Sequence, residues 1–183
     1  MRQLAMKYIG GRITTEVSDE IRIRNYTPED FEQMLDALVP LTVNRYEETD
    51  LDNVILKKVG VNPEGVFVAE VDGKIVGTAT GYFHPAHDDK PGDNGGTLHM
   101  VSALASASGK GVGRAVCASA VNYLVDAGCE YVDLTTDDFR LPAIVTYMRL
   151  GFRPVIDDAE MEERWSALAE KLGIPAIIKE AYR

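Results

Sequence analysis

The pattern of hydrophobic and polar positions predicts alternating strands and helices along most of the chain. Residues 21–24 alternate as a strand, and residues 27–30 have the order of a helix start, with a Thr cap, a Pro and two acids. Apolar residues at 31, 34, 35 and 38 then share one helical face. A second helix is predicted near residues 51–59.

The same pattern predicts a hairpin and a series of alternating elements after residue 60. Two apolar runs, residues 65–71 and 74–82, meet at Asp72-Gly73, a type I′ turn signal. The later elements are a strand at 97–104, a helix at 111–127, a strand at 130–136, a helix at 141–150, a strand at 152–156 and a helix at 159–172.

The first twenty residues carry the weakest pattern. Residues 7–15 are compatible with a hairpin around Gly10-Gly11, with an ordered tail, or with an arm between subunits. The chain has no repeats and no linker, so we expect one domain over residues 1–183. Its core spans about 21–156, with an N-terminal arm 1–20 and a C-terminal helix and tail 157–183.

Composition narrows the classes of protein. The 183 residues carry a formal charge of −10, which argues against nucleic acid as a partner. The negative charge would either attract a cationic amine or serve solubility alone. No apolar run approaches a membrane span, and the chain begins without a secretion signal, so we expect no membrane partner and a cytoplasmic protein. Cys117 and Cys129 have neither disulfide-scaffold nor metal-site spacing.

A glycine-rich turn in residues 97–114 suggests an anion site. Gly109, Gly111 and Gly113 lie where a strand passes into a helix, so their backbone N–H groups can approach a phosphate at the positive end of the helix. The spacing fits neither a P-loop nor the dinucleotide fingerprint.

Two motifs resemble those of the GNAT N-acetyltransferases. Ser108–Gly113 is similar to the turn Arg/Gln-x-x-Gly-x-Gly/Ala of that family, with Ser in place of Arg or Gln. Arg140–Phe152 resembles the later motif Asn-x-x-Ala-x-x-x-Tyr-x-x-x-Gly-Phe, with Arg140 in place of Asn. Both occur in the family's order, about thirty residues apart.

The resemblance implies an α+β, three-layer fold. A mixed, mostly antiparallel central sheet with splayed strands is flanked by helices, and the pantetheine arm of acetyl-CoA, the cosubstrate, lies in the splayed gap. The residues implied in donor binding are Met100, Val101, Ser102, Ala103, Ser108, Gly109, Lys110, Gly111, Val112, Gly113, Arg114, Arg140, Ala143 and Tyr147.

The resemblance also implies catalytic roles for two residues. Tyr147 stands where the family places the general acid that protonates the leaving thiolate, and the alternative is a core aromatic on an amphipathic helix. His99 is the first candidate for the general base, since strand alternation points it to the same face as Val101 unless a bulge intervenes. A backbone N–H near Val101 would stabilise the oxyanion. Glu70, Tyr82 and Asp133 are lesser candidates for the base, as is water.

Several residues keep two interpretations. Lys110 and Arg114 add positive charge to the phosphate site or are ordinary helix-terminal cations, and Arg140 contacts the donor or pairs with the acids at 137–138. The acidic loop is a solvated surface or contacts a cationic acceptor through Tyr46, Glu47, Glu48, Asp50 and Asp52. Residues 84–96 form a rim of the site or a plain connection, with a metal site as a remote alternative.

The function implied is an acetyl-CoA-dependent N-acetyltransferase that acetylates a primary amine, most simply that of a small molecule. The alternatives are acetylation of a protein N-terminus or lysine, and a non-catalytic CoA-binding sensor or subunit. Dimers are common in the family, which leaves a homodimer open. The N-terminal arm or the Trp165 helix would form its interface, although either could equally cover the chain's own core.

Overall fold

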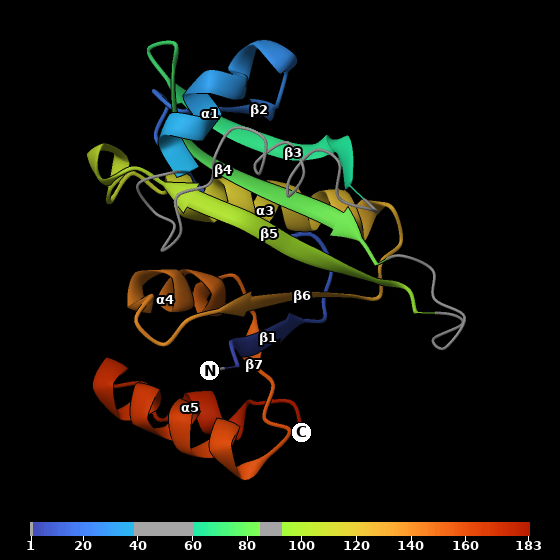
Figure 1. Cartoon of the computed structure of the whole chain (residues 1–183), viewed down its shortest axis with the longest axis vertical. Helices are drawn as coiled ribbons and strands as arrows, with labels where there is room; N and C mark the ends of the chain where they lie inside the picture. The colour runs from blue at the N-terminus through green and yellow to red at the C-terminus, as the bar shows by residue number, and fades with distance from the viewer. Residues whose placement is uncertain (1, 39–60, 85–92) are drawn as a thin grey trace.

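The computed structural model describes residues 2–38, 61–84 and 93–183 (Figure 1). The predicted helix at 51–59 and the acidic loop lie outside the described residues. The strands are β1 (Leu4–Tyr8), β2 (Arg22–Asn25), β3 (Val61–Val71), β4 (Lys74–Phe83), β5 (Gly95–Ala103), β6 (Tyr131–Thr136) and β7 (Arg153–Pro154). The helices are α1 (Phe31–Leu38), α3 (Val112–Asp126), α4 (Leu141–Arg149), α5 (Ala159–Leu172) and α6 (Ala176–Lys179).

All seven described strands form one sheet, in the order β2-β3-β4-β5-β6-β1-β7. Within the described part of the chain the strand pairs are antiparallel except β5 with β6, which is parallel. The sheet is therefore mixed and mostly antiparallel with flanking helices, as expected. The hairpin of β3 and β4 turns at Asp72 and Gly73, both with positive φ, which confirms the predicted turn.

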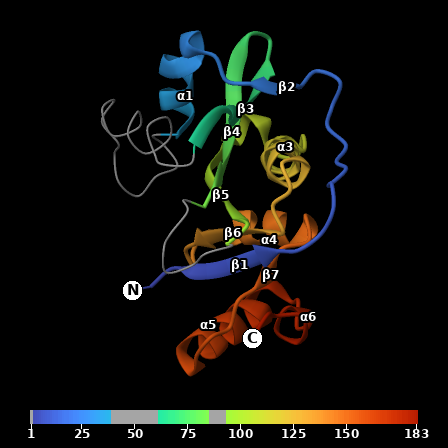
Figure 2. The ribbon, with the colours of Figure 1, turned by 90° about the vertical axis from the view of Figure 1, so that its right-hand side faces the viewer.

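Helices cover the β2–β5 part of the sheet on both faces. Met34, Ala37 and Leu38 of α1 pack with Val66 and Ile75 in one buried cluster, while α3 belongs to the larger cluster on the other side. Figure 2 shows α1 and α3 on opposite sides of these strands. The buried surface of α3 is wider than a single stripe, and includes Ala115, Cys117, Ala118 and Val121.

Residues 4–8 form an inner strand of the sheet, which was not predicted from the sequence. Strand β1 lies between β6 and β7 and pairs antiparallel with both. Leu4 and Met6 are fully buried in the main core. No hairpin forms at Gly10-Gly11; instead, the Tyr8 hydroxyl donates a hydrogen bond to the Gly11 carbonyl oxygen at 2.6 Å. The sequence concealed this strand because only five residues pair and their partners lie more than 120 positions away.

The C-terminal helix α5 has the predicted bounds and packs against the chain's own core. Trp165 is fully buried and Met161 is buried beside it. The tail after α5 forms the short helix α6, and Tyr182 makes a parallel bridge to Val155. The predicted strand at 152–156 is reduced to the two residues of β7. Among the described residues, none of the helices is long and apolar enough to span a membrane.

Candidate functional site

Strands β5 and β6 are joined at one end and separate toward the other. Parallel pairs run from Gly95 opposite Tyr131 to Thr97 opposite Asp133, and the register goes no further. Toward their carboxyl ends β5 continues to Ala103 and β6 to Thr136 without pairing to each other. The sheet therefore contains the splayed gap that the family resemblance implies.

A bulge in β5 lies beside this gap. Thr80 of β4 pairs with His99, but Thr78 pairs with Ser102, so β5 has one extra residue there. Met100 has a φ of 48°, in the left-handed region that is strained for a side chain. The bulge interrupts the alternation, which is the exception that the sequence prediction allowed, so His99 and Val101 do not share a face.

The bulge divides the β5 side chains between two environments. Met100 packs against the α1 cluster, and the Ser102 hydroxyl donates to the Ala37 carbonyl oxygen of α1 at 2.6 Å. Val101 and Ala103 pack with the main core cluster and border the gap. Bulged residues also leave backbone groups outside the ladder, so β5 can pair with an extended ligand there.

A cavity of about 290 Å³ occupies the gap between β5 and α4. It brings together seven of the predicted donor-binding residues, and Phe139, Pro142 and Thr146 also line it. The predicted members of the lining are Val101, Ser102, Ala103, Gly113, Arg140, Ala143 and Tyr147. Thr146 lies three residues after Ala143 on α4, so the helix face of Ala143 was the signal that could have found it, whereas Phe139 lies before the helix and Pro142 is not at helical spacing from either predicted residue.

The glycine turn lies at the start of α3, next to this cavity. Gly109 and Gly111 have φ values of 78° and 84°, which favour glycine, and Gly111 is the residue before the helix. The first bond of the helix runs from Ala115 N–H to the Gly111 carbonyl oxygen. The N–H groups of residues 112–114 precede that bond, so they have no acceptor within the helix and are available to an anion.

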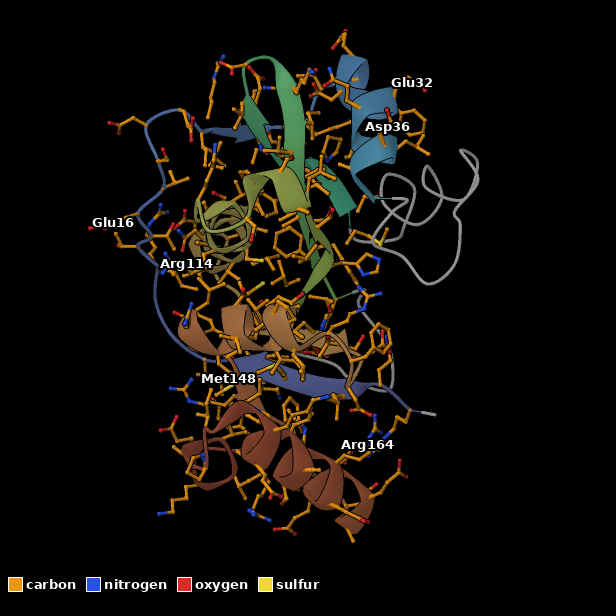
Figure 3. All side chains as sticks on the ribbon, turned by 90° about the vertical axis from the view of Figure 1, so that its left-hand side faces the viewer. Glu16, Glu32, Asp36, Arg114, Met148 and Arg164 are labelled. Atoms are coloured by element: carbon orange, nitrogen blue, oxygen red, sulfur yellow. The ribbon has the colours of Figure 1, made fainter. Side chains whose placement is uncertain are left out.

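The charged residues of the turn have different surroundings. Lys110 Nζ lies 2.7 Å from Glu20 Oε1, from the segment before β2. Arg114 lies on the first turn of α3, and Figure 3 shows it at the same edge as Glu16. Ser108, Gly109, Lys110, Gly111, Val112 and Arg114 are not in the cavity lining, whereas Gly113 is.

Tyr147 comes from α4 and is buried where the cavity meets the core. Its ring centre lies 6.0 Å from that of Phe152, and its side chain is 7% exposed. Burial, with Cys117 nearby, raises the pKa of the Tyr147 phenol well above its usual value. The hydroxyl thus keeps its proton at neutral pH and is suited to donate a hydrogen bond to a departing thiolate.

Arg140 lines the cavity and also forms an ion pair with Asp137, the alternative to donor contact that the sequence left open. Its Nε donates to Asp137 Oδ2 at 3.1 Å, and its guanidinium lies 5.6 Å from the centre of the Phe139 ring. Asp138 pairs with Arg164 instead.

The candidate bases occupy different places. His99 on β5 and Tyr82 on β4 stack edge to face, with ring centres 5.6 Å apart. The Glu70 carboxylate, near the carboxyl end of β3, accepts a hydrogen bond from Arg24 Nε at 2.8 Å. Arg24 also donates to Asp30, so the Glu70 carboxylate has a structural role.

Asp133 belongs to a polar network at the joined end of the gap. Its Oδ1 accepts from the Thr97 hydroxyl at 2.6 Å, and its Oδ2 lies 3.3 Å from His84 Nε2. His84 Nδ1 lies 3.2 Å from Asp93 Oδ2, and Tyr131 donates to Asp93 Oδ1 at 2.6 Å. These contacts tie β4, β5 and β6 together. They also lower the pKa of Asp93, chiefly through Tyr131 and then His84.

The metal alternative gains no support from the described residues 2–38, 61–84 and 93–183. In those residues no group of three or more His, Cys, Asp or Glu side chains is arranged to hold a metal ion. His87, Asp88 and Asp89 lie outside the described residues.

The sequence profile of the Acetyltransferase (GNAT) family matches residues 31–152, well over half of the chain. The chain therefore belongs to this family of acetyltransferases, which confirms the resemblance of its two motifs. The match includes the bulged strand, the glycine turn and the helix that carries Tyr147.

Individual relatives support the same family. A mycothiol acetyltransferase of Cellulomonas flavigena is 36% identical over 100 residues, covering 52% of this chain and 29% of that protein. The matched part is thus under a third of that relative. A GCN5-related N-acetyltransferase from Sphaerobacter thermophilus has a TM-score of 0.68 at 20% identity, over 84% of this chain and 49% of that one.

A second similar structure contains a coenzyme A derivative. It is AAC(6')-Iy in complex with the bisubstrate analogue CoA-S-monomethyl-acetylneamine, and its TM-score is 0.60 at 19% identity. The match covers 73% of this chain and 90% of that one. At these identities the two structures show a common fold.

Proposed function

We propose that this protein is an acetyl-CoA-dependent N-acetyltransferase that acetylates the primary amine of a small molecule. The observation that carries the proposal is the cavity between β5 and α4, with a bulged strand on one side and a buried tyrosine on the other. Family membership and the CoA analogue bound by AAC(6')-Iy support the donor. The similarity to a mycothiol acetyltransferase supports a small-molecule acceptor.

The donor would be held along three parts of the site. Its pantetheine arm would lie in the apolar gap beside Val101 and Ala103, pairing with β5 as an added strand does. The pyrophosphate would lie at the glycine turn, residues 109–114, and would accept hydrogen bonds from the N–H groups of residues 112–114 at the start of α3. Arg140 and Ala143 would contact the arm from α4.

The chemistry would be a direct transfer within a ternary complex. The neutral amine attacks the thioester carbonyl carbon, a C–N bond forms, and the C–S bond breaks as the thiolate leaves. A backbone N–H of the bulge near Val101 would stabilise the oxyanion, and Tyr147 would donate its proton to sulfur. His99, next to the bulge, would accept the proton lost by the amine.

A thiol-release assay with acetyl-CoA and a panel of primary amines tests the proposal. Release of coenzyme A that depends on one class of small amine is the expected result. Binding of coenzyme A with no thiol released by any acceptor would instead identify a CoA-binding sensor or subunit. Release with peptides alone would move the acceptor to a protein N-terminus or lysine.

The base assignment has its own test. Replacing His99 with Gln should lower kcat/KM most at neutral pH and remove an ionisation from the acidic limb of the pH–rate profile. The substitution Tyr82→Phe keeps the ring that stacks on His99 and removes the hydroxyl of a lesser candidate base, so a profile altered by Y82F and not by H99Q would assign the proton to Tyr82. An unaltered profile for H99Q would assign the proton to another group or to water.

We also propose that the protein acts in the cytoplasm. Cys117 is buried and Cys129 is half-buried, and both are free thiols. This fits a reducing compartment.

A further inference from the structure

Residues 9–20, which we call the strap, join β1 to β2 and lie against the proposed donor phosphate site. The two strands lie far apart in the sheet, since β1 is between β6 and β7 whereas β2 is the opposite edge. The strap therefore has to cross the molecule. In Figure 2 it runs along the outer side of α3.

The strap is attached to α3 by specific contacts. The Asn122 side chain accepts from Ile13 N–H at 2.7 Å and donates to the Ile13 carbonyl oxygen at 2.9 Å, as a strand neighbour would. Arg12 pairs with Asp126, and the Ile13 and Val17 side chains pack against the main core. The strap is thus a fixed part of the fold on this side of α3.

The end of the strap meets the glycine turn. A Cβ atom built on Gly111 would lie 3.0 Å from the Glu16 carbonyl oxygen and 3.8 Å from Val17 Cα. Lys110, the cation within the turn, is paired with Glu20 at 2.7 Å. The absence of a side chain at Gly111 therefore serves contact with the strap, in addition to the positive φ of that residue.

The strap carries negative charge, as do the phosphates of the proposed ligand. Glu16, Asp19 and Glu20 are all exposed and lie in five consecutive positions, beside a turn that would receive the phosphates of coenzyme A. Lys110 and Glu20 are 38% and 48% exposed, so water and salt weaken their pair and a phosphate can replace the carboxylate. The contact with Lys110 also lowers the pKa of Glu20, which stays ionised at neutral pH.

We propose that Glu20 is an internal competitor for Lys110, which the donor's phosphate must displace when it binds. The inference rests on the proposed function, because it takes coenzyme A as the ligand of the glycine turn. Glu20 holds the lysine side chain at the turn before binding and lowers the affinity for the donor. A ligand that lacks the phosphate contacting Lys110 does not displace Glu20, so its affinity should not depend on Glu20.

Calorimetric titration of coenzyme A into the full chain tests the inference. Because exposed pairs contribute little, Glu20→Gln should tighten binding by about 2–5-fold at low ionic strength and by less at high ionic strength. Asp19→Asn removes the same charge one residue away, and among the described residues Asp19 forms no ion pair. This control should change the affinity by much less.

A double-mutant cycle separates competition from a structural effect. Lys110→Met should weaken binding, and adding Glu20→Gln in that background should produce no further gain. Repeating the titrations with dephospho-CoA identifies the phosphate: a gain with coenzyme A alone points to the 3′-phosphate, and an equal gain with both points to the pyrophosphate.

Three outcomes would overturn the inference. They are an E20Q affinity equal to or weaker than that of the unaltered chain, an equal gain in D19N, and a gain that persists without Lys110. If the unaltered chain binds no coenzyme A, the proposed donor is itself wrong, and the inference fails with it. Circular dichroism of each variant confirms that the fold is retained.

Discussion

The two ends of the β5–β6 pair differ in chemistry although the same strands form both. At the joined end, polar side chains from three strands meet across parallel hydrogen bonds, with Thr97, Asp133 and His84 within 3.3 Å of one another. At the open end, apolar residues and the bulge border a cavity of about 290 Å³.

The two ends show how neighbouring strands can separate along part of their length while the strand order of the sheet is kept. The polar network holds the strands together up to Asp133, while the bulge at Met100 lies where β5 and β6 no longer pair. Because β5 and β6 pair at one end, the gap is closed at that end. The open end then offers backbone groups to a ligand, and the joined end limits how far that ligand enters.

Filling the open end should have the largest effect. Ala143→Trp places a large side chain in the cavity and should weaken binding of coenzyme A by ~1000-fold, or about 4 kcal/mol. Isothermal calorimetry measures this. Ala127→Trp, at an exposed position, is the control and should bind normally. Near-normal binding by A143W would place the donor outside the cavity.

Removing the hydroxyl of Tyr147 should affect turnover and spare binding. Tyr147→Phe should lower kcat by about 100-fold, with the Kd for coenzyme A changed less than twofold. Because burial raises the phenol pKa, the unaltered enzyme should show no loss of kcat from Tyr147 ionisation as pH rises toward 10. Tyr123→Phe on α3 is the matched control. Equal kcat values for Y147F and the unaltered chain would remove the acid role.

Weakening the joined end should reduce stability and leave the cavity open. Tyr131→Phe removes the hydroxyl that donates to Asp93, and should cost about 1 kcal/mol in the free energy of unfolding at pH 7. Urea unfolding measures it. In an Asp93→Asn background the same change should cost less.

The pH dependence of this variant has a definite sign. The pKa of Asp93 is lowered in the folded state, so its contribution to stability is present above the unfolded value of about 3.9 and is lost as pH falls toward the lower folded value. The cost of Y131F should therefore shrink in acid. A cost that is constant with pH would show that Tyr131 acts through packing.

The smallest effect is expected at Arg140. Arg140→Asn restores the residue that the family's motif has at this position and breaks the pair with Asp137. A side-chain amide can accept a hydrogen bond from the pantetheine amide, so the KM for acetyl-CoA should fall by about 2–5-fold. Arg149→Asn, at an exposed position on the same helix, is the control. An increased KM for R140N would show that the guanidinium binds the donor better than a side-chain amide does.

Local patterns predicted most of the fold. The hairpin at Asp72-Gly73, the strand–turn–helix around Gly111 and the bounds of α5 all follow from signals within a few residues. The motif that ends in Gly151-Phe152 located Tyr147 through its resemblance to the family's motif. Each of these elements is specified by the residues within it and at its ends, so hydrophobic periodicity and turn residues are sufficient to predict it.

Long-range pairing accounts for what the sequence did not reveal. Strand β1 depends on partners in β6 and β7, and the strap follows from that placement. The bulge that separates His99 from Val101 is a property of the β4–β5 register, which no single segment specifies. The network of His84, Asp93 and Tyr131 likewise joins residues up to 47 positions apart.

The central claim is that the gap between β5 and α4 receives the pantetheine arm of acetyl-CoA. A crystal structure obtained with saturating coenzyme A tests it most directly. The account predicts the arm between Val101–Ala103 and Ala143–Tyr147, with the pyrophosphate at residues 109–114. Coenzyme A bound elsewhere, with the gap free of it, would contradict the account.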